Sequence, residues 1–205
     1  MKNKIINTCI AATLLGLTSV SAQAASIWLT PTTQTIGLTG VATLEMYADA
    51  SDVGGFLAGG LDIFYDNSIL TYNGDFAFNP DFPTDPFFSR PGENGDPDDC
   101  AVVMAPGCSV PGEINGIAFG NFNGLAADGP VLVGTLSFTG INIGISPVTM
   151  ADNDLPAGAW YATDGSGPLV VDYGSAEINV VPIPAAVWLF GTGLLGLIGV
   201  ARRRK

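Results

Sequence analysis

The chain has 205 residues, with 19 Asp and Glu against 7 Lys and Arg, no histidine, and a formal net charge of −12. Six cations lie in the first four and last four residues, so the region from 25 to 180 keeps only Arg90 and carries 1 − 19 = −18 charges. Such a surface repels phosphate backbones, which excludes nucleic acid as a partner.

The composition also excludes several kinds of catalysis. Without histidine, neither a Ser-His-Asp triad, a Cys-His pair nor a histidine-ligated zinc site can form, and no lysine lies between residues 5 and 204 to make a Schiff base. Paired carboxylates that hydrolyse glycosides stay open in principle, but no spacing singles out a pair. We therefore expect a protein that is not an enzyme and has no catalytic residues.

Residues 1–24 have the pattern of a signal peptide. Lys2 and Lys4 precede a mostly apolar run from Ile5 to Val20, and Ala22-Gln23-Ala24 forms a small-residue cleavage site. An uncleaved membrane helix is disfavoured by the shortness of the apolar run. We expect export, cleavage after residue 24 and a mature chain that starts at Ala25.

Residues 25–180 are enough for a single domain with a real core, and their pattern predicts an all-β fold. Short runs of β-branched, aromatic and leucine residues alternate with Gly, Asn, Asp and Pro, without a sustained helical period. Strands in this number predict a β-sandwich. They are Ser26 to Leu29, Val41 to Ala48, Ala58 to Tyr65, Ile69 to Tyr72, Ile114 to Phe119, Val131 to Thr139, Gly158 to Ala162 and Ser175 to Val180.

Two motifs in this region resemble the cohesin-like jelly-roll sandwich. One is the glycine-led run Gly59-Gly60-Leu61-Asp62-Ile63-Phe64-Tyr65-Asp66, which continues through a tight turn to Leu70, and the other is Gly134-Thr135-Leu136-Ser137-Phe138. The resemblance implies the sandwich scaffold. True cohesins bind a dockerin partner, but many exported domains of this architecture have no known ligand, so the implied function stops at the scaffold.

The least regular stretch is the predicted loop 73–113, which is long for a compact domain and therefore a candidate for function. Its phenylalanine rings could stack on sugars or fill a partner's pocket, or could instead close one end of the core. These rings are Phe76, Phe78, Phe82, Phe87 and Phe88.

Cys100 and Cys108 lie in the second half of this loop, with Pro106-Gly107 offering a turn between them. In an oxidising compartment two cysteines at this spacing are expected to form a disulfide. A catalytic cysteine or a metal-binding thiol would lack any histidine partner.

An acidic cluster in the same loop is the best candidate for a Ca²⁺ site, because calcium takes several carboxylate and carbonyl oxygens from flexible loops. The alternative is a solvated acidic loop, and the EF-hand register is absent. No other cofactor is expected. The cluster consists of Glu93, Asp96, Asp98 and Asp99.

Residues 181–205 form a tail in which 183–201 carry no charge. As a helix this run would span roughly 28 Å, about the hydrocarbon thickness of a bilayer. The following cations, Arg202, Arg203, Arg204 and Lys205, predict a basic stop on the cytoplasmic side. A buried core helix is the alternative, but such a helix seldom runs this far without a polar face.

The tail resembles the PEP-CTERM family of sorting signals in its V-P-L-P-A variant, with Val181, Pro182, Ile183, Pro184 and Ala185 in the motif positions. Isoleucine stands at the third place and the Pro-Glu-Pro core is absent, which leaves the sortase subtype open. The resemblance implies transient insertion in the inner membrane and cleavage by an exosortase-type membrane protease. It also implies delivery to the surface or exopolysaccharide matrix of a Gram-negative bacterium.

Two functions follow as hypotheses. The first is a structural role for an acidic sandwich in the envelope or in exopolysaccharide. The second is a recognition module that binds a glycan or a protein through loop 73–113.

Overall fold

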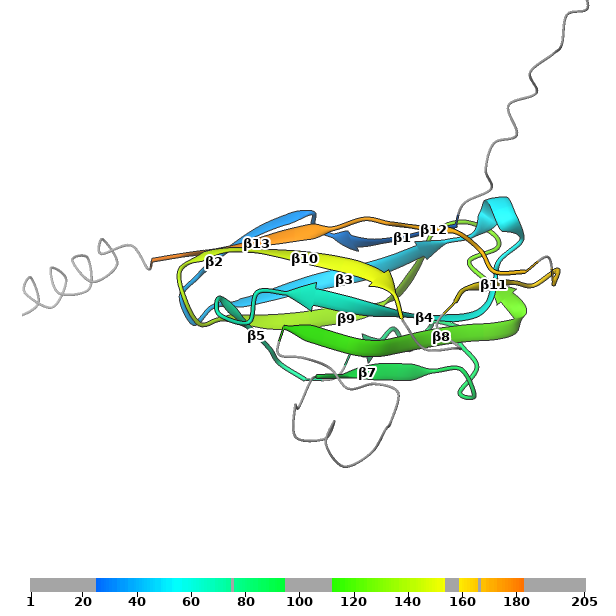
Figure 1. The fold of residues 1–205 in the computed structure, drawn as a ribbon, viewed down its shortest axis with the longest axis horizontal. Helices are drawn as coiled ribbons and strands as arrows, with labels where there is room; N and C mark the ends of the chain where they lie inside the picture. The colour runs from blue at the N-terminus through cyan, green and yellow to red at the C-terminus, as the bar shows by residue number, and fades with distance from the viewer. Residues whose placement is uncertain (1–24, 75, 95–111, 154–158, 166, 183–205) are drawn as a thin grey trace, which may run out of the picture.

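A computed structural model of the chain describes residues 25–74, 76–94, 112–153, 159–165 and 167–182. It shows two β-sheets packed face to face, which confirms the expected all-β sandwich (Figure 1). Residues 1–24, expected to be a signal peptide, and residues 183–205 lie outside the described part, as do Asp96, Asp98, Asp99, Cys100 and Cys108. Among the described residues, no helix is long and apolar enough to cross a membrane.

The first sheet has its strands in the order β12, β1, β3, β9, β5, with β6 pairing separately to β9. All of its pairs are antiparallel except β1 with β12. The bounds are β1 Ala25–Thr30, β3 Val41–Asp49, β5 Leu70–Tyr72, β6 Ala77–Phe78, β9 Val131–Gly140 and β12 Val171–Tyr173.

The second sheet has the order β2, β13, β10, β4, β8, β7, and β11 pairs to β4 beyond this path. A short 3₁₀ turn, η1 (Ser51–Val53), connects β3 to β4. The strands are β2 Thr33–Gly37, β4 Phe56–Tyr65, β7 Arg90–Asn94, β8 Glu113–Leu125, β10 Gly144–Asp152, β11 Tyr161–Ala162 and β13 Ala176–Val181.

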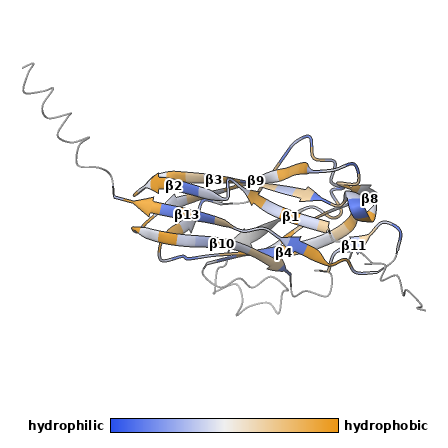
Figure 2. Ribbon diagram, turned by 90° about the horizontal axis from the view of Figure 1, so that it is seen from above, coloured by the Kyte–Doolittle hydropathy of each residue, from blue (hydrophilic) through white to orange (hydrophobic). Residues whose placement is uncertain are grey.

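The core lies between the sheets and follows from the two-residue period of the strands. In β3, Ala42, Leu44, Met46 and Ala48 are fully buried while the residues between them face outward. Figure 2 shows apolar and polar positions following one another along strands such as β10 and β13. The described sandwich starts at Ala25, which is itself buried and paired with Val171.

Several strands were not predicted from the sequence. β10 is the most important, because it lies between β4 and β13 and contains Pro147, a residue that a central strand normally excludes. The strand tolerates this proline because its pairing with β4 starts only at Val148, opposite Tyr65. One residue earlier, the Ser146 hydroxyl accepts the Asp66 amide at 2.9 Å in place of a ladder bond.

The predicted loop 73–113 is more regular than expected where it is described. It contributes β6 to the first sheet and β7 to the edge of the second. The expectation of one irregular loop is therefore wrong for Ala77–Phe78 and Arg90–Asn94, whereas the residues between them form turns and irregular structure as expected. Towards the C-terminus, the predicted strand Gly158 to Ala162 shortens to Tyr161–Ala162, whereas Ser175 to Val180 corresponds to β13.

Candidate functional site: an aromatic pocket on the second sheet

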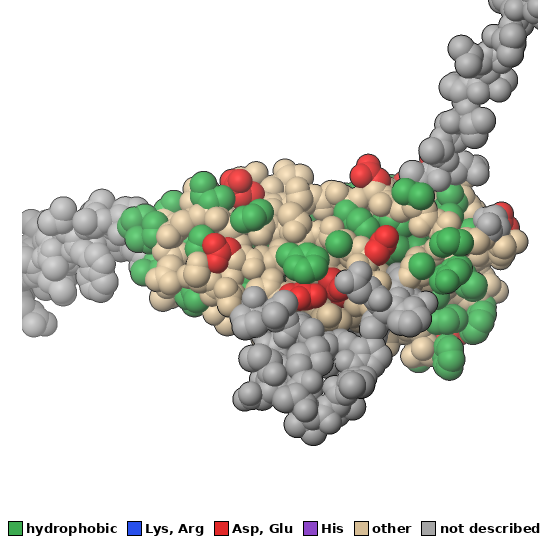
Figure 3. All heavy atoms as spheres, viewed as in Figure 1, with side chains coloured by type: hydrophobic (Ala, Val, Ile, Leu, Met, Phe, Trp, Pro, Cys, Tyr) green, Lys and Arg blue, Asp and Glu red, His purple; other side chains and the backbone are tan. Residues whose placement is uncertain are grey.

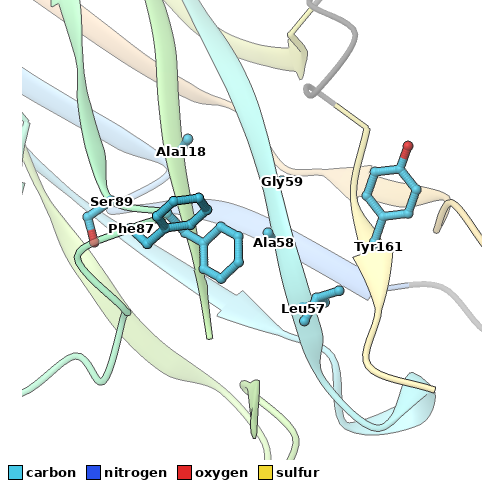
Figure 4. A pocket seen from close by; sticks show the side chains of 8 residues that line it. Leu57, Ala58, Gly59, Phe87, Ser89, Ala118 and Tyr161 are labelled. Atoms are coloured by element: carbon cyan, nitrogen blue, oxygen red, sulfur yellow. The ribbon is translucent and has the colours of Figure 1, made fainter. Parts of the chain in front are cut away.

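A pocket of about 560 Å³ opens on the outer face of the second sheet. Its floor is formed by β4 and β8, and its sides by the turn before β7 and by β11. Figure 4 shows Tyr161 on one side of β4 and Phe87 on the other, with Ala58 between them. The lining residues are Leu57, Ala58, Gly59, Phe87, Phe88, Ser89, Ala118 and Tyr161.

The floor is hollow because small residues meet across β4 and β8. Ala58 pairs with Gly120, and Gly60 pairs with Ala118. A Cβ on Gly120 would lie 2.4 Å from the Leu57 carbonyl oxygen, so that position accepts only glycine. The aromatic rings around this floor therefore stand above it and leave space between them.

Beneath the floor, Trp160 fixes the position of β11 against the sheet. Its ring lies 4.8 Å from that of Phe56 and 4.7 Å from that of Phe119, measured between centroids, and the residue is fully buried. Its indole N–H donates to the Tyr173 hydroxyl at 2.7 Å, and that hydroxyl donates to an Asp152 carboxylate oxygen at 2.7 Å. Burial and, next to it, the bond to Asp152 raise the pKa of Tyr173 well above its ordinary value.

Hydrogen bonds to β8 anchor the turn that carries Phe87 and Phe88. The Asp85 amide donates to the Gly120 carbonyl at 2.8 Å, and the Thr84 hydroxyl bonds the same carbonyl at 3.1 Å. Within the turn, the Phe87 amide donates to the Asp85 carboxylate at 2.8 Å. The turn that carries both rings is therefore held in place by hydrogen bonds.

The structure divides the five phenylalanines of the predicted loop into two groups. Phe76 and Phe82 are 3% and 6% exposed and belong to the core, where Phe82 packs edge-on to Phe119. Phe78 is partly buried against both of them. Phe87, in contrast, is 82% exposed and lies beside Phe88 on the surface. The core hypothesis is therefore correct for Phe76 and Phe82, whereas the recognition role of the exposed ring of Phe87 stays a prediction.

Two aromatic residues that sequence reasoning missed extend this surface. Phe122 is 65% exposed and its ring lies 4.8 Å from that of Phe88, while Tyr161 is 39% exposed on the opposite side of the pocket. Phe122 shares the outward side of β8 with Ala118 and Gly120, so correct strand alternation could have identified it. We call Phe87, Phe88, Phe122 and Tyr161 the aromatic patch.

A buried polar cluster lies beside the pocket, where β4, β8 and β10 meet. Asp62 is 5% exposed and accepts the Gly116 amide at 2.8 Å and the Asn153 side-chain amide at 2.5 Å. Asn153 also donates to Asn115 at 3.1 Å. Gly116 has φ +73, a left-handed conformation that favours glycine and turns its N–H toward the carboxylate.

The predicted calcium ligands are not brought together by the described residues. Glu93 lies in β7, and its three expected partners fall outside the described ranges. Within those ranges, no group of three or more Cys, Asp or Glu residues is arranged to hold a metal ion.

The chemistry of the pocket favours an apolar occupant. Its lining has two hydroxyl groups, and that of Ser89 already bonds the Asp85 carbonyl and Thr84. A glycan needs several polar groups to replace the water bound to its hydroxyls, because an unpaired polar group is costly to bury. An apolar side chain of a protein has no such requirement and fits a site of this size.

No family model matches the chain, and no curated protein matches it. Solved structures do resemble it, at low sequence identity. One is a type I cohesin–dockerin complex from Clostridium thermocellum, with TM-score 0.54 and 10% identity over 77% of this chain and 99% of that one.

A second is the seventh ScaB type I cohesin from Pseudobacteroides cellulosolvens, with TM-score 0.51 and 11% identity over 78% of this chain and 94% of that one. A third is CaCohA2 from Clostridium acetobutylicum, with TM-score 0.50 and 20% identity over 80% of this chain and 94% of that one. At such identities the likeness concerns the fold alone. The described residues between 25 and 182 therefore form a single β-sandwich with the cohesin-like fold.

Proposed function

We propose that this protein is an exported recognition module that binds a partner protein through the aromatic pocket. The observation that carries the proposal is the exposure of Phe87, at 82%, on a turn that hydrogen bonds hold in place over an apolar hollow. Exposed aromatic clusters of this kind mark interaction sites, because burying them on binding releases much of the free energy of association. A purely structural role in a matrix does not call for such a surface.

The fold supports the same conclusion, since similar structures were solved as cohesin–dockerin complexes. The charge of −18 in the region 25–180 further favours a partner with a basic surface, which the acidic domain would attract from a distance. The partner we infer therefore offers one or two apolar side chains surrounded by lysine or arginine.

The proposal includes the location of the protein. Residues 1–24 export the chain, and residues 183–201 hold it in the inner membrane until an exosortase-type protease acts at the motif starting at Val181. The composition of both segments supports this route. The released domain would then function at the cell surface or in the exopolysaccharide matrix.

Site-specific photo-crosslinking in the native host tests the recognition function. The photoreactive amino acid p-benzoylphenylalanine replaces Phe87 in the full chain, and in a matched control it replaces Thr43, an exposed residue of β3 on the first sheet. We expect one defined protein adduct at position 87, absent at position 43 and lost when Phe88→Ala is added. Adducts of equal yield at both positions, or polysaccharide adducts alone, would contradict the proposal.

A further inference from the structure

The end of the sandwich where β13 stops is built from three turns and the last described residues. The Leu38 amide donates to the Val181 carbonyl at 2.9 Å, and the Ile141 amide donates to the Ile69 carbonyl at 2.8 Å, so these segments form one surface. We call this surface the tip. It comprises residues 37–41, 66–69, 140–145 and 180–182.

The tip exposes large aliphatic side chains that no described residue covers. Figure 3 shows hydrophobic side chains gathered at this end of the molecule, where the described chain stops at Pro182. Branched aliphatic residues exposed together are unfavourable in water and indicate a surface that is covered in use. Their exposed fractions are 57% for Val41, 42% for Ile141, 58% for Ile143 and 53% for Ile145.

The tip itself carries little charge. Asp66 is the only charged residue among those that form it. Glu113 and Glu177 lie on strands that lead to the tip, whereas a larger group of carboxylates lies towards the opposite end, around the start of β1 and the pocket side of β4. This larger group consists of Asp49, Asp52, Asp128, Asp152, Asp164 and Asp172.

A single residue, Pro182, separates the end of β13 from the uncharged run 183–201. If that run crosses a bilayer, as the proposed function holds, no linker remains to lift the domain from the membrane. The tip must then lie at headgroup level, where apolar side chains are favourable and carboxylates would meet repulsion from anionic lipid. Tethering also makes the local lipid concentration very high, so even weak insertion is effective.

From these observations we infer that the tip is a lipid-docking surface, in which Ile141, Ile143 and Ile145 enter the outer interface of the bilayer beside the anchor. The inference rests on the membrane anchor of the proposed function and is independent of the aromatic pocket. Docking holds the long axis of the sandwich upright, with the pocket and the acidic end directed away from the membrane.

Fluorescence of the full chain in vesicles of phosphatidylethanolamine and phosphatidylglycerol tests the inference. The environment-sensitive amino acid dansylalanine replaces Ile143, and in a matched control it replaces Val170, which is 77% exposed at the opposite end. We expect a blue shift at position 143 and quenching by lipids with a spin label near the headgroup, and neither effect at position 170. Resistance to alkaline extraction reports separately on the anchor.

The outcomes separate the two ideas. Retention of the chain in the membrane with a fully aqueous signal at position 143 overturns lipid docking and leaves the anchor standing. A blue shift without lipid quenching means that a second copy covers the tip, which also overturns the inference. If alkali extracts the chain from the membrane, the chain has no membrane anchor, and the docking inference, which rests on that anchor, fails as well. Crosslinking at Phe87 is unaffected by any of these results.

Discussion

The indole of Trp160 occupies the space that a side chain on residue 59 would need. A Cβ built on Gly59 would lie 2.3 Å from Cδ2 of Trp160, too close for any real contact. Because residue 59 is glycine, Trp160 can pack between Phe56 and Phe119 under the floor of the pocket. The glycine is thus as much a part of the site as the aromatic rings above it.

Replacing Gly59 with alanine should displace Trp160 and lower the free energy of unfolding by about 1–3 kcal/mol, as overpacked cores do. Its neighbour Gly60 provides a matched control, since a Cβ there would meet nothing closer than 3.5 Å. Chemical denaturation of both variants, with tryptophan emission as the readout, measures the difference. Equal stabilities would show that Trp160 can move without cost.

Phe82 and Phe87 should respond oppositely to truncation. Phe82→Ala removes a ring that is 6% exposed and packs on Phe119, so we expect a loss of about 3–5 kcal/mol in stability. Phe87→Ala removes a ring that is 82% exposed, and we expect a change within about 0.5 kcal/mol. Thermal melts of the two variants check this, and similar losses would mean that Phe87 is buried in solution.

Tyr173→Phe should destabilise the domain by about 1–3 kcal/mol, because the buried Trp160 N–H loses its acceptor. It should also change the dependence of stability on pH. The folded state raises the pKa of Tyr173 above 10.0, so its contribution is complete below pH 10 and is lost as the pH rises beyond that value.

Denaturation of wild type and Tyr173→Phe between pH 8 and 11 measures this effect. The variant should lose less stability above pH 10, and part of the alkaline loss should remain because burial also raises the pKa of Tyr65. Parallel pH profiles would place the Tyr173 hydroxyl in water.

Asp62→Ala should cost about 1–3 kcal/mol, because it removes the acceptor of the buried Gly116 amide and one of the two acceptors of the Asn153 side-chain amide. Asp62→Asn keeps an acceptor oxygen at the same place and should cost less. Asp128→Ala, at an exposed position between β8 and β9, serves as a surface control. If Asp128→Ala lowered the free energy of unfolding more than either Asp62 variant, the buried Asp62 hydrogen bonds would not stabilise the fold as described.

Intact mass of the protein from its host tests the two sorting segments together with the cysteines. We expect a mature start at Ala25, loss of the tail near residues 181–185, and a decrease equal to two hydrogens for a Cys100–Cys108 disulfide. Peptide mapping with and without reductant locates the bond. A mass that retains residues 188–205 would identify the tail as a permanent anchor.

The alternation of Val41–Asp49 and Leu61–Tyr65 was sufficient to predict β3 and most of β4, because half-buried strands have a clear period. β2 and β12 were missed since their sequences are polar or short, and each is held by parallel pairing to a strand far along the chain. β10 was missed because it contains Pro147, and proline, which has no N–H to donate to a neighbouring strand, normally argues against a central strand.

For the site, the sequence predicted that phenylalanine rings would take part, but not which of them would be exposed. Phe82 and Phe87 lie five positions apart in a similar context, yet one is in the core and the other on the surface. What separates them is the bond from Asp85 to the Gly120 carbonyl, a contact between distant segments that no local pattern reveals. Phe122 and Tyr161 join the aromatic patch for the same reason, through the pairing of β4 with β8 and β11.

The position of β13 has a mechanical consequence. The strand runs towards the tip and is hydrogen-bonded on both sides, in parallel to β2 and antiparallel to β10. In the anchored chain, before the proposed cleavage, a pulling force between Val181 and a partner held at the pocket would act along the strands. It would load both ladders in shear, so that their bonds must break together and not one after another. This arrangement suits a domain that has to stay folded, with its partner bound, under flow or tension.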